Sequence, residues 1–176
     1  MKMQRLSGIA LLALSLLSVG CDDDDDPITP ETPTQFTAAL DDANERPNAV
    51  TTTTNATGSA TFTVTANNEI TYTVRVANTT SAVTACHIHA GEDDAAGPVI
   101  VTLCNANPTT GAVTTETQIA TGTIRKGLNA QTVGSSPIDI PTLIKMIVDG
   151  DAYVNVHTSN NGGGEVRGQI VPSTTP

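Results

Sequence analysis

Three histidines are the residues of this 176-residue chain whose type and spacing could do chemistry. His87 and His89 stand one residue apart, and His157 lies in a second segment with similar, strand-like neighbours. Alternate side chains of a β-strand leave on the same face, so His87 and His89 point together while Ile88 points the other way. If Ile88 faces the core, both imidazoles face outward.

The second segment, Tyr153–Thr158, has the same alternation. Its valines would point inward, and Tyr153, Asn155 and His157 would point outward. Neutral imidazole is the commonest side-chain metal ligand, so three imidazoles that meet on a sheet surface would make an open site suited to copper or zinc. In the alternative, no metal binds and the histidines form hydrogen bonds within the sheet surface, to Glu165 or Asn155.

Other polar groups give less support to a chemical function. Glu165 and Arg167 share one face of a strand, which favours an ion pair or a hydrogen bond to the histidine strand over catalysis. The acidic turn 92–94 would hold a hard cation or be solvated, and its spacing does not match an EF-hand loop. Gly162–Gly164 precedes a strand rather than a helix, so it is not a phosphate loop. No Ser/His/Asp arrangement has recognisable spacing, and no enzymatic activity is indicated.

The start of the chain is typical of an exported protein. Lys2 and Arg5 precede the apolar run 9–17, which is too short to span a membrane and fits the core of a signal peptide over residues 1–20. The following Ser18–Cys21 resembles a bacterial lipoprotein cleavage box, although Ser18 departs from the usual Leu. Cys21 would then be acylated and anchor the protein to the membrane of the bacterial cell envelope. A plain secretory signal is the alternative.

Residues 21–34 predict an extended tether. Asp22–Asp26 is a run of like charges, and the prolines that follow neither continue a helix nor pair in a sheet. The acidic run also resembles an export signal that displays lipoproteins on the cell surface, and a simple spacer is an equal alternative. Without residues 1–20 the chain keeps six basic and eighteen acidic residues, a net charge of −12. Such a chain has no basic patch for nucleic acid, which we exclude as a partner.

The region 35–171 is predicted to be all-β. Thr and Val are abundant, and eight segments alternate or carry β-branched residues, followed by a tail at 172–176. These predicted strands are 36–40, 60–64, 70–76, 83–89, 99–104, 118–124, 152–158 and 165–171, and Gly122 suggests a bulge in the sixth. One short helix at about 141–149 interrupts them, capped by Asp139 or Thr142 and ended by Gly150. Short antiparallel strands with many turns indicate an Ig-like or superoxide-dismutase-like β-sandwich or a flattened barrel.

Cys86 and Cys104 are the remaining thiols once Cys21 is acylated. They lie on two predicted strands that would form a hairpin, and an exported protein permits oxidation, so we expect a disulfide. The side-chain alternation is awkward, because Cys86 shares the parity of Ile88 whereas Cys104 is opposite in parity to Leu103. A β-bulge would reconcile the two.

Several motifs follow one another in the order typical of one family. They are the strands up to Val76, His87-Ile88-His89, Gly97–Val101, Ala152–Thr158 and the closing Glu165–Ile170. Together they resemble a CHRD domain, the module named after chordin and common in bacterial secreted proteins. The resemblance covers about residues 35–171 and implies a binding or structural module with no assigned activity. Chordin sequesters signalling ligands, but nothing in this chain allows that partner to be transferred, and the partner stays an unknown protein or extracellular ligand.

There is a further similarity to the β-sandwich of copper–zinc superoxide dismutase. His87, His89, His157 and Arg167 would be the matching positions. The chain departs from that enzyme because no histidine is left to bridge two metals or to complete a zinc site. Dismutase activity is therefore not expected. The leading hypothesis is an envelope-anchored, non-enzymatic binding or structural module, and the alternative is a metal-binding, redox-active envelope protein.

Overall fold

The computed structural model describes residues 32–47, 50, 55–104, 107–125, 132–133 and 136–173. The predicted signal peptide and Cys21 lie outside these residues. No helix among them is long and apolar enough to cross a membrane.

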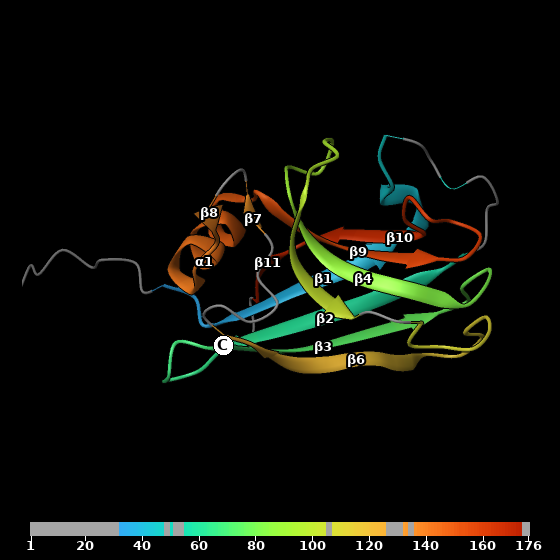
Figure 1. Cartoon of the computed structure of the whole chain (residues 1–176), viewed down its shortest axis with the longest axis horizontal. Coiled ribbons are helices and arrows are strands. Elements are labelled where there is room, and N and C mark those ends of the chain that lie inside the picture. Colours follow the sequence, from blue (N-terminus) through green and yellow to red (C-terminus); the bar gives the residue numbers. More distant parts are fainter. Residues whose placement is uncertain are drawn as a thin grey trace, which may run out of the picture. The chain divides into compact units, whose positions relative to one another are not determined.

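The described chain is mostly one antiparallel sheet (Figure 1). Its hydrogen-bonded order is β5-β4-β9-β10-β1-β2-β3-β6, with β11 pairing a further part of β1, and a separate pair is formed by β7 and β8. The strands are β1 (Gln35–Asp41), β2 (Thr57–Val64), β3 (Ile70–Ala77), β4 (Val83–Ala90), β5 (Val99–Cys104), β6 (Thr117–Ile124), β7 (Thr132–Val133), β8 (Ser136–Pro137), β9 (Ala152–Thr158), β10 (Val166–Gln169) and β11 (Val171–Pro172).

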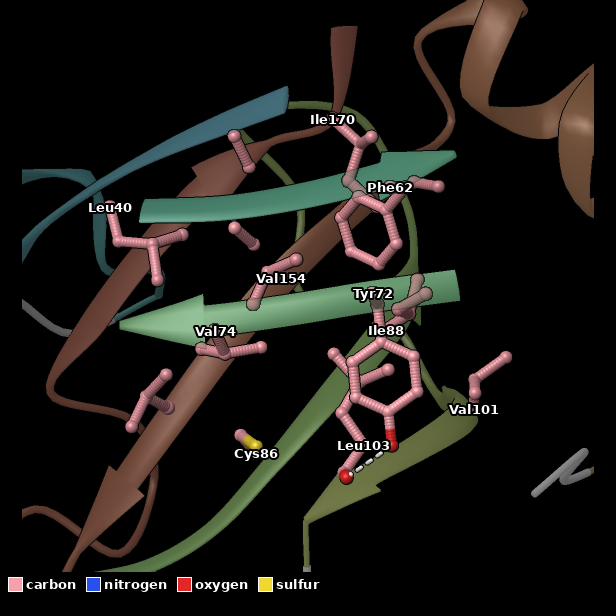
Figure 2. Packing of buried hydrophobic residues seen from close by; sticks show 14 of the residues in the cluster. Leu40, Phe62, Tyr72, Val74, Cys86, Ile88, Val101, Leu103, Val154 and Ile170 are labelled. Atoms are coloured by element: carbon pink, nitrogen blue, oxygen red, sulfur yellow. Dashed lines mark hydrogen bonds between the residues drawn. The ribbon is translucent and has the colours of Figure 1, made fainter. Parts of the chain in front are cut away.

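The sheet curves around the core until its two end strands come close to each other. β5 and β6 are the end strands of the sheet. Close to this seam the hydroxyl of Tyr72 on β3 donates a 2.8 Å hydrogen bond to the carbonyl oxygen of Leu103 on β5, as Figure 2 shows. The result is a nearly closed, flattened barrel. The prediction of an all-β fold with one short helix is confirmed.

The core is built by the alternation that the sequence shows. Phe62 of β2 lies in register with Tyr72 of β3, their ring centres 6.5 Å apart, and Ile88 and Val154 approach from β4 and β9 (Figure 2). All four side chains are buried. Burying a large apolar side chain contributes about 1.5–3 kcal/mol. The pairing of inward-facing residues therefore fixes the register of each strand and decides which side chains face away from the core.

The one α-helix among the described residues, α1 (Ile140–Asp149), begins and ends as predicted. The Asp139 side chain accepts a hydrogen bond from the backbone N–H of Thr142, which caps the N-terminus. Leu143 and Ile147, one turn apart, are buried against the barrel. Gly150 ends the helix with a positive φ of 84°, a conformation that glycine adopts without strain.

Two details differ from the sequence prediction. The predicted last strand divides into β10 and β11, and β11 extends to Pro172, which pairs with Phe36. The bulge that we expected at Gly122 lies elsewhere, since the register of β3 and β6 shifts between Val74 and Arg75. Gly122 instead makes room for a ring, because a Cβ there would lie 2.7 Å from the hydroxyl oxygen of Tyr72.

Candidate metal centre

Three neighbouring strands place the candidate residues on the face of the sheet that points away from the core. β9 lies between β4 and β10, and its Asn155 is paired with His87 on one side and Arg167 on the other. Two residues along, Tyr153 is paired with His89 and Gln169. Because register and alternation together fix a face, these side chains share one surface.

The three histidines converge on this surface. Nδ1 of His87 lies 3.1 Å from Nε2 of His157. His89 completes the group, and one ring nitrogen from each residue lies within 4.8 Å of the others. Ligands about 2.0–2.1 Å from a common zinc ion are roughly 3.3 Å apart in a tetrahedral arrangement. The His87–His157 pair is close to that spacing, whereas the group as a whole is wider, so the rings would move closer together to bind one ion.

Backbone carbonyls orient two of the rings. Nδ1 of His89 lies 2.8 Å from the carbonyl oxygen of Gly97, and Nδ1 of His157 lies 3.1 Å from that of Gly162. A carbonyl only accepts, so each Nδ1 carries the proton and each Nε2 presents a lone pair. Histidines that bind metals usually donate their other N–H to a carbonyl or carboxylate in this way.

Burial of the cluster differs from the expectation of an open surface. His89 is only 9% exposed, and His87 and His157 are half-buried. The Tyr153 ring stacks on His89 with 5.1 Å between ring centres. The carbonyl of Gly97, from the segment that joins β4 to β5, closes over His89. The face is therefore covered by loops that the strand alternation alone does not reveal.

Burial keeps the three imidazoles neutral. It is the main cause that lowers the pKa of His87 to about 4, and repulsion from His157 and His89 adds to it. Burial also lowers the pKa of His89, which the nearby Arg167 lowers further while the bond to Gly97 opposes the change. The pKa of His157 is lowered by burial and by His89, against the bond to Gly162. Neutral imidazole is the form that binds a metal.

Among the described residues, neither Glu165 nor Arg167 makes the ion pair or hydrogen bond to the histidine strand β4 that we expected. The Glu165 carboxylate is fully buried and accepts hydrogen bonds from the backbone N–H and hydroxyl of Thr80 and from the hydroxyl of Thr158. Arg167 is 1% exposed, lies with its guanidinium 3.5 Å from the centre of the Tyr153 ring, and donates to the carbonyl of Glu92. Both residues organise the surroundings of the site.

Asn155 also lacks the predicted bond to a histidine. Its Nδ2 donates a 3.3 Å hydrogen bond to Oε2 of Glu45. Glu45 follows the short 3-10 helix η1 (Asp42–Asn44) and is 2% exposed. Burial raises the pKa of this carboxyl to about 7, against the bond from Asn155 and the attraction of Arg167. The sequence did not point to Glu45, since an isolated glutamate in a loop is usually solvated.

The buried polar atoms that lack a partner gather on this face. In the part of the chain that the structure describes they are Glu45 Oε1, His89 Nε2, Asn155 Oδ1, Arg167 Nη1 and Gln169 Oε1. A buried polar group without a hydrogen bond costs about 1–3 kcal/mol. Clustering of such atoms indicates a site that takes up ligands or water rather than a surface with scattered defects.

The two cysteines come together on the opposite, core-facing side of β4. Cys86 and Cys104 are paired across β4 and β5, and their sulfur atoms are 2.14 Å apart, at disulfide distance. The register shifts between Cys86 and His87 and again between Ile88 and His89, which is the irregularity that the parity argument required. The side chains of the acidic turn 92–94 are exposed, and within the described residues the histidine cluster is the only group of three potential metal ligands.

Comparisons with known proteins give one match. No curated protein and no solved structure matches this chain. The similarity to copper–zinc superoxide dismutase therefore remains one of motif. The family model of the CHRD domain matches residues 36–170, which is most of the chain and runs from the second residue of β1 to beyond the end of β10. This chain is a member of the CHRD-domain family.

Proposed function

We propose that this protein is an envelope-anchored CHRD binding module that holds one copper or zinc ion through His87, His89 and His157. The observation that carries the proposal is the convergence of three ring nitrogens within 4.8 Å. Nitrogen donors of this kind suit copper and zinc better than calcium or magnesium.

Two further features support metal binding. Two of the rings have their Nδ1 protons fixed by carbonyls, so that both Nε2 atoms present a lone pair. Nε2 of His89 is buried without a partner, and a metal would supply one. In the metal-free arrangement His87 donates its Nδ1 proton to Nε2 of His157, and on metal binding that proton would move to Nε2 of His87.

The test is metal content and affinity of protein purified without a histidine tag, which would add ligands of its own. We expect one zinc or copper ion per chain and a higher melting temperature with metal bound. His87→Ala, His89→Ala and His157→Ala should each weaken binding at least tenfold and by similar factors. Lys145→Ala, on the exposed side of α1, is the matched control and should bind as the parent does.

Because His89 packs on Tyr153, its alanine variant needs a companion. His89→Gln keeps a polar group of similar length, and circular dichroism would establish that each variant folds. Absence of stoichiometric binding at micromolar metal, or alanine variants that bind as tightly as the parent, would leave a second candidate function. In that case the 3.1 Å contact of His87 and His157 is an ordinary hydrogen bond, and the domain is a binding or structural module without metal.

The membrane anchor is part of the same proposal and rests on the sequence around Cys21. Cys21→Ala should move the protein from the membrane fraction to the soluble fraction and abolish incorporation of labelled fatty acid. Cys104→Ala is the control, because it removes a cysteine but leaves the anchor. Membrane retention of a cleaved, unacylated chain would contradict a lipid anchor, and where the protein resides in the envelope follows from fractionation of the parent.

A further inference from the structure

A second polar feature lies on the far side of Tyr153 from His89. It is a cavity of about 210 Å³ lined by Asn44, Arg46, Asp93, Arg167, Gly168 and Gln169. Its wall therefore combines two guanidinium groups and two side-chain amides with one carboxylate. Two of the five unpartnered buried atoms in the described structure, Nη1 of Arg167 and Oε1 of Gln169, belong to these residues.

The charge of Arg167 has no direct counterion. The residue is 1% exposed and forms no salt bridge in the described part of the chain. Its Nη2 donates to the backbone carbonyl of Glu92, and its guanidinium lies against the Tyr153 ring, but neither a carbonyl nor an aromatic ring carries a negative charge. Taking a guanidinium out of water is costly unless an anion accompanies it. The buried carboxyl of Glu45 lies within reach of this charge, but burial raises its pKa to about 7, so it offsets the charge of Arg167 only in part at neutral pH.

Arg46 is available to an anionic ligand as well. It uses Nη1 to donate to the carbonyls of Ala43 and Glu45, which holds the side chain at the cavity. Together, Arg46 and Arg167 contribute two positive charges and Asp93 one negative charge, so the lining is singly positive. Guanidinium groups bind carboxylates through paired N–H donors.

We propose that this cavity binds a small monocarboxylate, held between Arg46 and Arg167 with Gln169 as an acceptor for a hydroxyl or amide of the same ligand. A dianion such as sulfate or phosphate is disfavoured because Asp93 faces it. The carboxylate would be that of a small free molecule, for which acetate is the simplest probe. This site is separate from the histidine cluster and does not depend on bound metal.

Acetate is the probe, applied to the full chain stripped of metal, at constant ionic strength with chloride as the balancing ion. We expect a saturable rise in melting temperature and saturable heats in calorimetry with acetate, and neither with sulfate. Arg46→Ala should weaken acetate binding at least tenfold. Arg125→Ala removes the same charge from a surface ion pair with Glu69 and should leave binding unchanged.

A rim variant tests the charge argument without touching buried residues. Asp93 is exposed, so Asp93→Asn should fold normally, and it should tighten acetate binding several-fold and allow sulfate to bind. The proposal is overturned if acetate gives no saturable response, if Arg46→Ala and Arg125→Ala respond alike, or if sulfate binds the parent as tightly as acetate. Metal binding by the histidines is measured separately, so failure of one site is distinguishable from failure of the other.

Discussion

The guanidinium of Arg167 lies 3.5 Å from the centre of the Tyr153 ring. The same ring stacks on His89, with 5.1 Å between centres and 14° between planes. One aromatic side chain therefore contacts both a buried cation and a candidate metal ligand. A cation over an aromatic face is stabilised by about 0.5–2 kcal/mol, more when it is removed from water.

Substitution of Tyr153 should separate the role of its ring from that of its hydroxyl. The hydroxyl accepts a 3.0 Å hydrogen bond from the backbone N–H of Gly97, so Tyr153→Phe should cost about 1 kcal/mol and leave metal affinity nearly unchanged. Tyr153→Leu removes both ring contacts and should cost about 2–3 kcal/mol and weaken metal binding several-fold. Urea unfolding and metal titration measure the two effects. Equal losses in both variants would mean that the ring itself contributes little.

Position 164 requires glycine for two reasons, its backbone conformation and the lack of space for a side chain. Its φ is +137°, and a Cβ there would lie 2.5 Å from side-chain atoms of both Asn155 and Glu45. Gly164→Ala should therefore destabilise the fold by more than about 2 kcal/mol. Gly163→Ala is a control in the same loop, because a Cβ at Gly163 meets nothing within 4 Å. Thermal unfolding of the pair should show a clear difference; similar melting temperatures would contradict the crowding at Gly164.

Glu45 should make the fold less stable at alkaline pH. Its pKa is about 7 in the folded state, above the ordinary 4.5, so its contribution to stability is present below pH 4.5 and is lost as pH rises through 7. Glu45→Gln resembles the protonated side chain. It should equal the parent at pH 4 and exceed its free energy of unfolding by about 2–3 kcal/mol at pH 8. Glu116→Gln, at an exposed carboxylate, should show no such difference in urea unfolding.

Metal affinity should persist to lower pH than at a surface histidine site. Protons compete with a metal for imidazole nitrogen, but here the pKa of His87 is lowered to about 4 and those of His89 and His157 are also lowered. We expect the fall in affinity with decreasing pH to begin below the ordinary histidine pKa of 6.5. Competition titrations at decreasing pH would measure it. Loss of half the bound metal already near pH 6.5 would indicate solvated histidines.

The free energy of unfolding of the metal-free protein should fall as acid is added, because of the same histidines. The unfolded histidines take up protons near their ordinary pKa of 6.5, before the folded ones do. Their contribution to stability is thus complete above pH 6.5 and is lost as pH falls toward 4. Urea unfolding of the Glu45→Gln variant, which lacks the opposing carboxyl, would isolate this slope.

The Cys86–Cys104 bridge should stabilise the domain measurably. It closes a loop with a sequence separation of 18, which in the chain-entropy treatment contributes about 3 kcal/mol. The Cys86→Ala/Cys104→Ala double variant should lose about that much in urea unfolding and should match the parent unfolded in the presence of a reductant. Denatured, unreduced parent protein should show neither thiol in a titration. Two free thiols would contradict the bridge.

The local sequence pattern was sufficient to predict the strands of the barrel and its helix. The alternation around Phe62 and Tyr72 predicted a hairpin that the structure contains as β2 and β3, and Asp139 and Gly150 marked the two ends of α1. These features depend on neighbours in the sequence, which is why a single chain reveals them. Alternation also predicted that His87 and His89 share a face.

The surroundings of the site could not be predicted in the same way. Glu45 meets Asn155 across a sequence separation of 110, and the burial of Arg167 depends on the Tyr153 ring and on the carbonyl of Glu92. Charged side chains are expected at the surface, and only tertiary contacts decide which of them are covered. That β4 lies beside β9 is likewise a property of the topology and not of either strand.

The position of β1 in the middle of the sheet has a consequence for the order of assembly. One edge of β1 pairs with β2, which follows closely in the chain, but the other edge pairs with β10 and β11 at the end of the domain. Similarly, one edge of β4 stays unpaired until β9 has been made. A chain that emerges from its N-terminus first must keep two strand edges open until its last segment arrives, and open edges invite pairing with other chains. β9, which brings His157 to the histidine cluster, is therefore also one of the strands that end this period of exposure.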